Sequence, residues 1–268
     1  MHHLISLMKF NKILVAAFAA VCFSSCNKTF YQVYDVESKD LKLQDNSMVY
    51  ENDDCKVLYN LWSNNGELKF VIWNKTDKDI YINLAKTFYE VNGKANEYFR
   101  NRIYSSSAAN SISTTAGNIW GNNIFLALLG SKTQTVNTVN TYTIEKEIVC
   151  IPAKCYKEFN TYKLSPSLTV TCTSKQDFPS ESYKIKSYTE QDTPYTFSNR
   201  IAYNFSNDST NYKYIDNKFW VSNITNYSRG AATEDKTSKC YFKTTSRIFK
   251  VYGPNKFYVT YFKDGINY

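Results

Sequence analysis

Histidine is almost absent from this chain of 268 residues. The two histidines are His2 and His3, and residues 4–268 contain none. Ser-His-Asp and Cys-His catalytic arrangements, the HExxH metalloprotease motif and histidine-ligated zinc sites all need an imidazole. We therefore expect none of these chemistries, and no metal or other cofactor. Any catalysis would have to use carboxylate, tyrosine, lysine or thiol groups, so the sequence favours a protein that is not an enzyme.

Glycine and proline are also scarce, with 8 and 5 residues, and no long helical period of apolar residues is present. In contrast, 23 tyrosines and 17 phenylalanines occur among many β-branched residues. This composition favours strands over helices. It predicts an all-β protein with at most one or two short helices.

Basic residues exceed acidic ones, but they form no cluster. Removal of residues 1–25 would take away two lysines and no acid, which leaves 30 bases, 24 acids and a net charge of +6. No run of five or six bases is present, and no nucleic-acid recognition motif. We read this charge as a solvated surface near anionic lipid or glycan, and we expect no nucleic-acid partner.

The N-terminus has the features of a signal peptide. Lys9 and Lys12 precede an apolar segment at 13–23 (ILVAAFAAVCF), which is too short to span a membrane by itself. Met8 comes directly before the lysines, and we expect translation to start there. We expect cleavage to remove residues 1–25.

The sequence FSSC at 23–26 resembles a bacterial lipobox. The resemblance implies that Cys26 becomes the first residue and carries diacylglycerol on its sulfur and an acyl chain such as palmitate on its amine. Several acyl chains anchor a protein far more firmly than the marginal binding of one. The alternative is a secreted protein with a chance cysteine after its signal peptide.

Segments beyond the lipobox resemble uncharacterised lipoproteins from Bacteroidetes. These segments are CNKTFYQVYDVES at 26–38, and residues 49–62, 74–83, 197–201 and 219–227. The resemblance implies no particular activity. Lipoproteins of this phylum that reach the cell surface are usually acidic just after the cysteine, whereas this chain has Lys28 and no acid before Asp35. The resemblance therefore implies an outer-membrane lipoprotein that faces the periplasm, with the cell surface as the alternative.

Strand patterns and turns recur at intervals of about 8 to 12 residues, which is typical of an antiparallel β-sandwich. By fold analogy we expect an immunoglobulin-like sandwich. Asn92-Gly93 is a strong hairpin signal, and 233–240 is the one segment with a helical pattern. The predicted strands lie at 31–36, 56–62, 68–73, 80–84, 87–91, 142–151, 168–173, 195–205, 218–225 and 256–262.

Three regions follow the signal peptide in this interpretation. Residues 26–38 form the lipid tether and the first strand, 39–175 form the sandwich, and 176–268 form a C-terminal β-rich region packed on it. The sandwich contains a Ser/Thr-rich insert at 105–141 with a short apolar centre. We expect this insert to be a loop; an amphipathic hairpin that enters a membrane is the alternative.

Five cysteines remain once Cys22 and Cys26 are set aside. Cys150 and Cys155 are separated by four residues, so they do not match the CxxC spacing of redox and zinc motifs. They are the candidates for a local disulfide, and two buried free thiols are the alternative.

Few residues indicate a site. Asp53 and Asp54 fit a turn better than a catalytic pair, because adjacent residues of a strand face opposite sides. Asn74, Asp77 and Asp79 lack the spacing of a calcium loop. The remaining candidates are Trp62, Trp73 and Trp220 for stacking on sugar rings, and Ser209 in Asp-Ser-Thr for O-glycosylation.

The sequence thus predicts a lipid-anchored envelope protein that binds or scaffolds an envelope protein or glycan. Two alternatives remain open. One is a carboxylate-dependent enzyme that acts on glycans, and the other is a membrane-active protein that uses the 105–141 insert.

Overall fold

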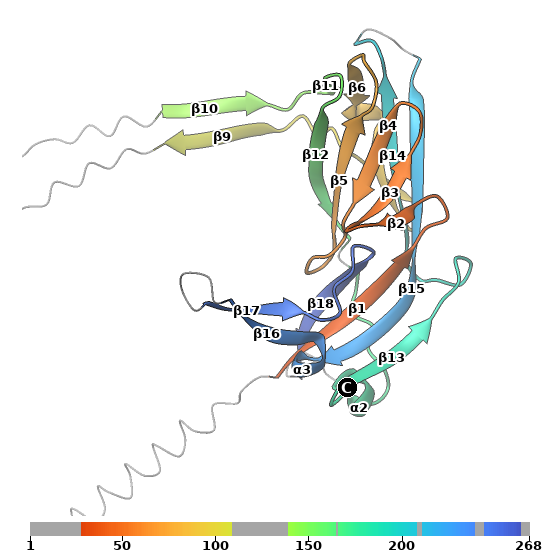
Figure 1. Cartoon of the computed structure of the whole chain (residues 1–268), viewed down its shortest axis with the longest axis vertical. Helices are drawn as coiled ribbons and strands as arrows, with labels where there is room; N and C mark the ends of the chain where they lie inside the picture. Colours follow the sequence, from red (N-terminus) through yellow and green to blue (C-terminus); the bar gives the residue numbers. More distant parts are fainter. Residues whose placement is uncertain (1–27, 109–138, 165, 208–210, 239–243, 264–268) are drawn as a thin grey trace, which may run out of the picture.

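The computed structural model describes residues 28–108, 139–164, 166–207, 211–238 and 244–263. Antiparallel strands dominate this part of the chain and form a curled, sandwich-like body (Figure 1). Two α-helices of four residues each, α2 (Ser174–Asp177) and α3 (Arg229–Ala232), and the 3-10 turn η1 (Leu84–Lys86) complete it. The prediction of an all-β sandwich with at most two short helices is confirmed.

The larger sheet has nine strands, and its longest strand, β15, runs through 16 residues. β1 lies between β15 and β18, so the first strand of the described chain is an inner strand. In spatial order the main path is β11 (Ile148–Ile151), β6 (Ile80–Asn83), β14 (Thr196–Asn204), β15 (Lys213–Ser228), β1 (Thr29–Glu37) and β18 (Lys256–Phe262). Three further strands join this path: β13 (Ser182–Ser187), β7 (Phe88–Val91) and β8 (Lys94–Glu97).

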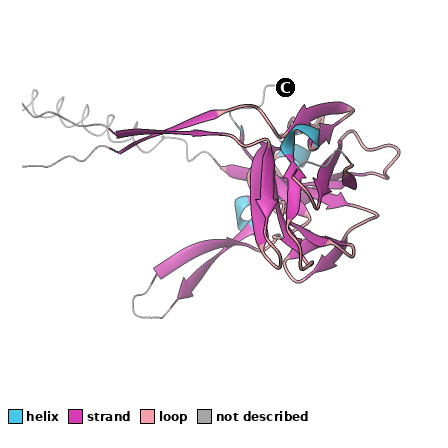
Figure 2. Cartoon of the chain, turned by 90° about the horizontal axis from the view of Figure 1, so that it is seen from above, coloured by secondary structure: helices cyan, strands magenta, loops and turns pink. Residues whose placement is uncertain are grey.

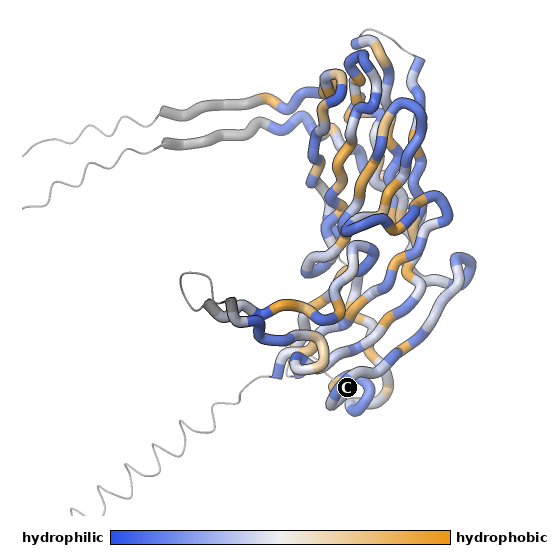
Figure 3. The backbone as a smooth tube through the Cα atoms, in the orientation of Figure 1, coloured by the Kyte–Doolittle hydropathy of each residue, from blue (hydrophilic) through white to orange (hydrophobic). Residues whose placement is uncertain are grey.

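The second sheet packs against the half of the larger sheet that contains β6, β7 and β14. Its order is β12 (Tyr156–Lys163), β5 (Glu67–Asn74), β4 (Cys55–Tyr59), β3 (Ser47–Glu51) and β2 (Lys42–Gln44). Along β5, Leu68, Phe70 and Ile72 are fully buried, whereas the residues between them face outward. This period of two places one face of the sheet in the core. In Figure 3 the hydrophobic segments lie on the strands of the body and the turns are mostly hydrophilic.

Two separate two-stranded ribbons project from the same side of the body (Figures 1 and 2). The first pairs β9 (Ile103–Ala108) with β10 (Val139–Ile144), and these strands flank the central part of the predicted insert. The second pairs β16 (Thr233–Ser238) with β17 (Thr244–Phe249). The insert residues 109–138 lie outside the described chain.

Several strand predictions are confirmed. The predicted strand 256–262 is β18, and the predicted pairing of 195–205 with 218–225 is the β14–β15 pair, in which Ser198 lies opposite Lys218. The hairpin signal is also correct: Asn92 and Gly93 connect β7 to β8 with φ angles of 46° and 82°. Both residues therefore have the positive φ that a two-residue type I′ turn requires.

The predicted helix at 233–240 is wrong. Thr233 has extended angles, with φ −129° and ψ 159°, and it ends α3 instead of starting a helix. The residues that follow pair with β17, where Asp235 lies opposite Arg247 and the two form a salt bridge of 2.9 Å. Cross-strand pairing therefore prevails over a weak local helical signal in a segment that contains β-branched threonines.

Two further strand predictions need correction. The segment 142–151 is divided between β10 and β11, because Glu145 leaves the strand and accepts hydrogen bonds from the backbone N–H groups of Arg100 and Arg102. The segment 168–173 contains no strand. Its Thr169 backbone instead donates to and accepts from the side-chain amide of the buried Gln32, at 2.8 Å in both directions.

The predicted regions 39–175 and 176–268 share one sheet. β6 and β11 come from the first region, β14 and β15 come from the second, and the four strands are continuous neighbours. The buried residues of both regions also form a single hydrophobic core. The C-terminal region therefore completes the sandwich and does not form a separate layer outside it.

Candidate functional site

The three candidate tryptophans lie at separate places. Trp62 follows β4 and packs against Phe249, Tyr252 and Tyr258, with ring centroids 5.1, 5.4 and 5.0 Å away. These neighbours surround the indole and fix the base of the β16–β17 ribbon. Trp62 is half-buried among these rings and has a packing role there.

Trp73 lies on the outer face of β5. Because Ile72 points into the core, the next side chain points to solvent, and Trp73 is 42% exposed. Directly opposite on β12 lies Tyr156, which is 72% exposed. Side chains directly opposite on neighbouring strands have Cβ atoms about 5 Å apart. We call this pair, Trp73 and Tyr156, the aromatic platform.

Polar and charged groups surround the aromatic platform. Lys56 lies opposite Trp73 on the β4 side, and the indole Nε1 donates to the backbone oxygen of Lys154 at 3.3 Å. Lys154 also pairs with Asp77 at 3.1 Å. An aromatic centre with a charged rim is the composition that binding surfaces favour over ordinary protein surface.

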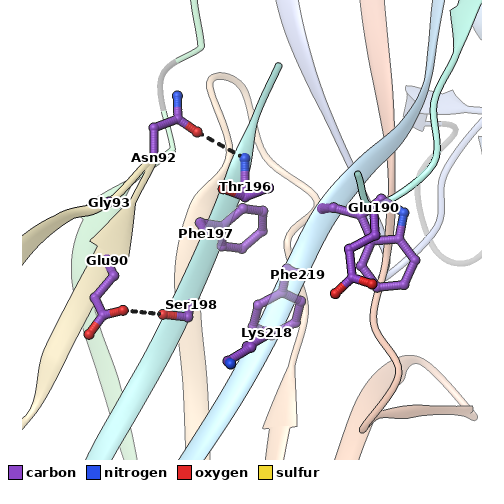
Figure 4. Close-up of a pocket in the computed structure, with 10 residues that line it drawn as sticks. Glu90, Asn92, Gly93, Glu190, Thr196, Phe197, Ser198, Lys218 and Phe219 are labelled. Carbon is purple, nitrogen blue, oxygen red and sulfur yellow. Dashed lines mark hydrogen bonds between the residues drawn. The ribbon is translucent and has the colours of Figure 1, made fainter. Parts of the chain in front are cut away.

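Trp220 is largely buried and lines a cleft on the outer face of the larger sheet (Figure 4). The cleft has a volume of about 190 Å³. Three polar side chains form a row across neighbouring strands: Glu90 on β7, Ser198 on β14 and Lys218 on β15. The Ser198 hydroxyl donates to the Glu90 carboxylate at 3.0 Å.

A second acid lies on the other side of this row. Figure 4 shows Glu190, from the segment after β13, on the opposite side of Lys218 from Glu90. Glu190 pairs with Lys39. The Lys218 ammonium has no ion-pair partner among the residues that the structure describes. The cleft therefore presents two carboxylates and one ammonium group to a small polar ligand.

Asp54 is part of a polar cluster and not of a catalytic pair. Its carboxylate accepts from the Tyr203 hydroxyl at 2.8 Å and from the Lys213 ammonium at 2.6 Å. Burial disfavours the charged form of Asp54, but the two hydrogen bonds outweigh burial and hold the pKa of Asp54 below its usual value. The backbone N–H of Asp54 donates to the Asn52 side chain, which is the turn that the sequence predicts.

The Asn74, Asp77 and Asp79 segment is likewise a structural turn. The Asn74 side chain accepts from Thr76 and donates to the backbone oxygens of Lys78 and Ile151. Asp79 accepts from the backbone N–H of Ala153. No group of three or more metal-binding side chains is found within the described residues.

The disulfide predicted between Cys150 and Cys155 is not present, since both are exposed free thiols. Cys150 belongs to β11 of the larger sheet, where its Sγ lies 3.7 Å from Oδ2 of Asp79. Cys155 lies in the turn just before β12, the first strand that the chain adds to the second sheet after β11. The buried cysteine is Cys55, and burial together with the neighbouring Asp54 raises the pKa of its thiol to about 12.

Two sequence predictions fall outside the described residues: the lipidation site Cys26 and the O-glycosylation site Ser209. Sequence reasoning missed four residues of these sites, namely Tyr156, Glu90, Glu190 and Lys218. Each belongs to its site only because of the sheet pairing or a loop position. Alternation of side chains would identify the outward-facing positions, but it would not show which strands are neighbours.

Comparison with known proteins gives no relative. No protein-family model, no curated protein and no solved structure matches the chain. The immunoglobulin-like topology thus stays a prediction. Within the described residues, no helix has the length and apolarity needed to cross a membrane.

Proposed function

We propose that the protein is a lipid-anchored module of the cell envelope that binds a glycan without altering it. In this proposal Cys26 carries the lipid in the outer membrane, and the folded body extends into the periplasm. The observation that carries the proposal is the position of the aromatic platform relative to the anchor.

The proposed anchor lies next to the fold. Cys26 precedes Thr29, the first residue of β1, by three residues. Three residues span at most about 10 Å when fully extended. The Thr29 end of β1, which pairs with Phe262 of β18 and lies beside Ser228 of β15, would therefore sit against the membrane.

The aromatic platform lies toward the other end of the molecule. β15 runs from Lys213 to Ser228, a length of about 50 Å at about 3.3 Å per residue. Its Lys213 end contacts Asp54. Lys56, which follows Asp54 by two residues, lies opposite Trp73. The protein would therefore hold its platform far from the membrane, where it can meet a ligand.

The chemistry of the platform favours a glycan. Sugar rings have an apolar face of C–H groups that stacks on aromatic rings, and hydroxyl groups that bond to a charged rim. The exposed rings of Trp73 and Tyr156 offer the apolar surface, and Lys56 and Lys154 offer the charged rim. Contiguous exposed apolar surface with a polar rim is a feature that binding sites share.

Binding of purified envelope glycans to a soluble form that starts at Asn27 tests this function. This form retains every described residue. We expect it to bind sheared peptidoglycan or the glycan part of lipopolysaccharide, and we expect Trp73→Ala and Tyr156→Ala each to weaken binding at least about 10-fold. Tyr214→Ala, which removes an exposed tyrosine from another strand, is the control. If the unsubstituted soluble form and the three variants all bind with equal affinity, the aromatic platform is not the binding site.

The anchor needs its own measurement. Metabolic labelling with palmitate should mark the full chain, and Cys26→Ser should abolish both the label and membrane association. A Cys26→Ser variant that stays membrane-bound would contradict the anchor but would leave the glycan measurement valid.

One alternative is a carboxylate-dependent enzyme that acts on glycans, and the two acids of the cleft in Figure 4 are the observation behind it. Glycosidases need two carboxyl groups on either side of a bond, at about 5 to 9.5 Å. Glu90 and Glu190 lie on either side of Lys218, yet each already has a partner, and a cleft of about 190 Å³ is smaller than most ligand pockets. Glycan cleavage that is lost in Glu90→Gln and Glu190→Gln would favour this alternative.

The β9–β10 ribbon favours the membrane-active alternative, because it projects as a separate sheet (Figure 1) and flanks the insert predicted at 105–141. Release of dye from vesicles by the wild type, but not by a variant without residues 109–138, would support it.

A further inference from the structure

We propose that the Thr29 end of the larger sheet is a docking surface for a bilayer with anionic phospholipid headgroups. The docking surface consists of Lys28, Arg229, Phe262 and Lys263. This inference rests on the proposed anchor, and it adds an orientation: the body would stand on its sheet end and would not pivot about a three-residue tether.

An exposed aromatic residue lies at this end, on the edge strand β18. Phe262 is the last residue of β18, directly opposite Thr29, and it is 45% exposed. Its neighbour in the chain, Tyr261, points inward and packs on Phe30, with ring centroids 5.7 Å apart. Phe30 in turn packs on Phe178 at 5.2 Å. This buried cluster fixes the strand end, so the Phe262 side chain is held toward solvent.

Basic residues lie near Phe262 on both faces of this sheet end. Lys28 precedes Thr29 and is exposed, and Lys263 follows Phe262, with its Nζ 5.9 Å from the Phe178 ring centre. Arg229 begins α3 directly after Ser228, which lies opposite Phe30. The Arg229 guanidinium has no ion-pair partner among the described residues. Figure 1 shows α3 beside the start of β1, so the three bases share one end of the sheet.

Among the residues that the structure describes, acidic side chains at this end are fewer than the bases. Glu181 is exposed, and its backbone oxygen accepts from Ser228; Glu234 is exposed on β16. Asp177, the last residue of α2, is a third acid at this end; it is buried, and its carboxylate accepts from the backbone N–H of Thr171. Lys250, whose ammonium donates to the backbone oxygen of Gly230, adds a fourth base against these three acids. Arg247 is neutralised by Asp235. The excess positive charge matches an anionic headgroup layer.

Geometry brings this surface to the headgroups. The cysteine sulfur and amine would place their acyl chains in the hydrocarbon core, and the chain from Cys26 to Thr29 reaches at most about 10 Å. The headgroup layer of one leaflet is itself about 5 to 8 Å thick. The tether therefore keeps the sheet end within a few ångströms of the headgroup layer. Aromatic and basic residues are the side chains that favour this interface.

Cosedimentation of the soluble form with vesicles tests the docking surface without the anchor. We expect binding to vesicles of phosphatidylglycerol and phosphatidylcholine, weaker binding as salt is added, and little binding to phosphatidylcholine alone. Each base near an anionic surface contributes about 5-fold, so Arg229→Gln/Lys263→Gln should bind about 30-fold more weakly. Phe262→Ser should weaken binding about 5-fold or more.

The matched control is Lys42→Gln/Lys94→Gln, which removes two exposed lysines from β2 and β8. This control should bind the vesicles as the parent does. If Arg229→Gln/Lys263→Gln also binds as the parent does, the docking surface is wrong. Palmitate labelling of the full-length Arg229→Gln/Lys263→Gln variant should remain complete, so failure of the docking surface and failure of the anchor at Cys26 give different results.

Discussion

The hydroxyl of Tyr59 donates a hydrogen bond of 2.8 Å to Oδ1 of Asn217 in the middle of the core between the two sheets. The Tyr59 oxygen accepts from Asn199 at 3.0 Å, and Asn199 accepts from Tyr98 at 3.0 Å. All four residues are fully or almost fully buried. Asn199 and Asn217 lie opposite each other in β14 and β15. The network therefore connects the second sheet to this pairing of two strands in the larger sheet.

Removal of the Tyr59 hydroxyl should destabilise the fold. Tyr59→Phe leaves Oδ1 of Asn217 and the amide of Asn199 without this partner, and each unsatisfied buried group costs about 1 to 3 kcal/mol. We expect a loss of at least about 2 kcal/mol in the free energy of unfolding in urea at an unchanged m-value. Tyr156→Phe removes an exposed hydroxyl and should change stability by less than about 0.5 kcal/mol. Equal stability of the two variants would contradict an energetic role for the network.

This network also shows what the sequence predicts and what it does not. Alternation predicts that Tyr59 and Phe219 face inward, because they lie in strands with buried residues at every second position. It does not predict that two asparagines enter the core, because asparagine is usually exposed. Gln32 is a similar case: its buried side-chain amide bonds to the backbone of Thr169, in the segment 168–173 for which the sequence predicts a strand.

Two glycines with positive φ should respond differently to alanine. Gly66 has a φ of +64°, and an added Cβ would lie 2.9 Å from Cδ1 of Leu164 and 3.0 Å from Cγ of Phe257. Gly93 has a φ of +82° and open space around it. Gly93→Ala should cost about 1 kcal/mol from backbone strain, whereas Gly66→Ala adds about 1 to 3 kcal/mol of overpacking. Thermal unfolding of both variants tests this order, and a Gly93→Ala variant as unstable as Gly66→Ala would contradict it.

The candidate sites were less predictable than the fold. Residue type identifies Trp73 as a candidate, but the partner that makes it a platform, Tyr156, is 83 positions away in the chain. Trp62 has the same residue type and is instead half-buried against three aromatic rings. Long-range pairing decides which tryptophan stays open, and a single sequence carries little information about that pairing.

Thiol labelling should separate Cys55 from the exposed cysteines. Iodoacetamide reacts with the thiolate, and burial holds the pKa of Cys55 at about 12, so almost none is ionised at pH 8. Cys150, Cys155 and Cys172 are exposed free thiols. Mass spectrometry of peptides from folded protein at pH 8 should find carbamidomethyl groups on these three, and on Cys55 only after unfolding in urea. Rapid modification of Cys55 in the folded protein would contradict its burial.

Acid should weaken the fold partly through Asp54. Its folded pKa lies below the ordinary aspartate value of about 3.9, so the unfolded state binds protons first as the pH falls. The stabilisation by Tyr203 and Lys213 is therefore present above about pH 4 and is lost as the pH falls through the folded pKa. Lys213 and Tyr203 both contribute to it, and because the Lys213 side chain is 56% exposed, solvent screens part of its ion pair.

Urea unfolding of the wild type and Asp54→Asn across this pH range measures the effect. At pH 6 to 7 we expect Asp54→Asn to be less stable by about 2 kcal/mol, from the lost charge-assisted bond, and we expect the difference to shrink as the pH falls from 4 toward 2. Asp53→Asn is the matched control, because the Asp53 side chain has no hydrogen bond or ion pair within the described residues. A difference between wild type and Asp54→Asn that stays constant from pH 7 to pH 2 would show that the Asp54 carboxylate is not held in its charged form by Tyr203 and Lys213.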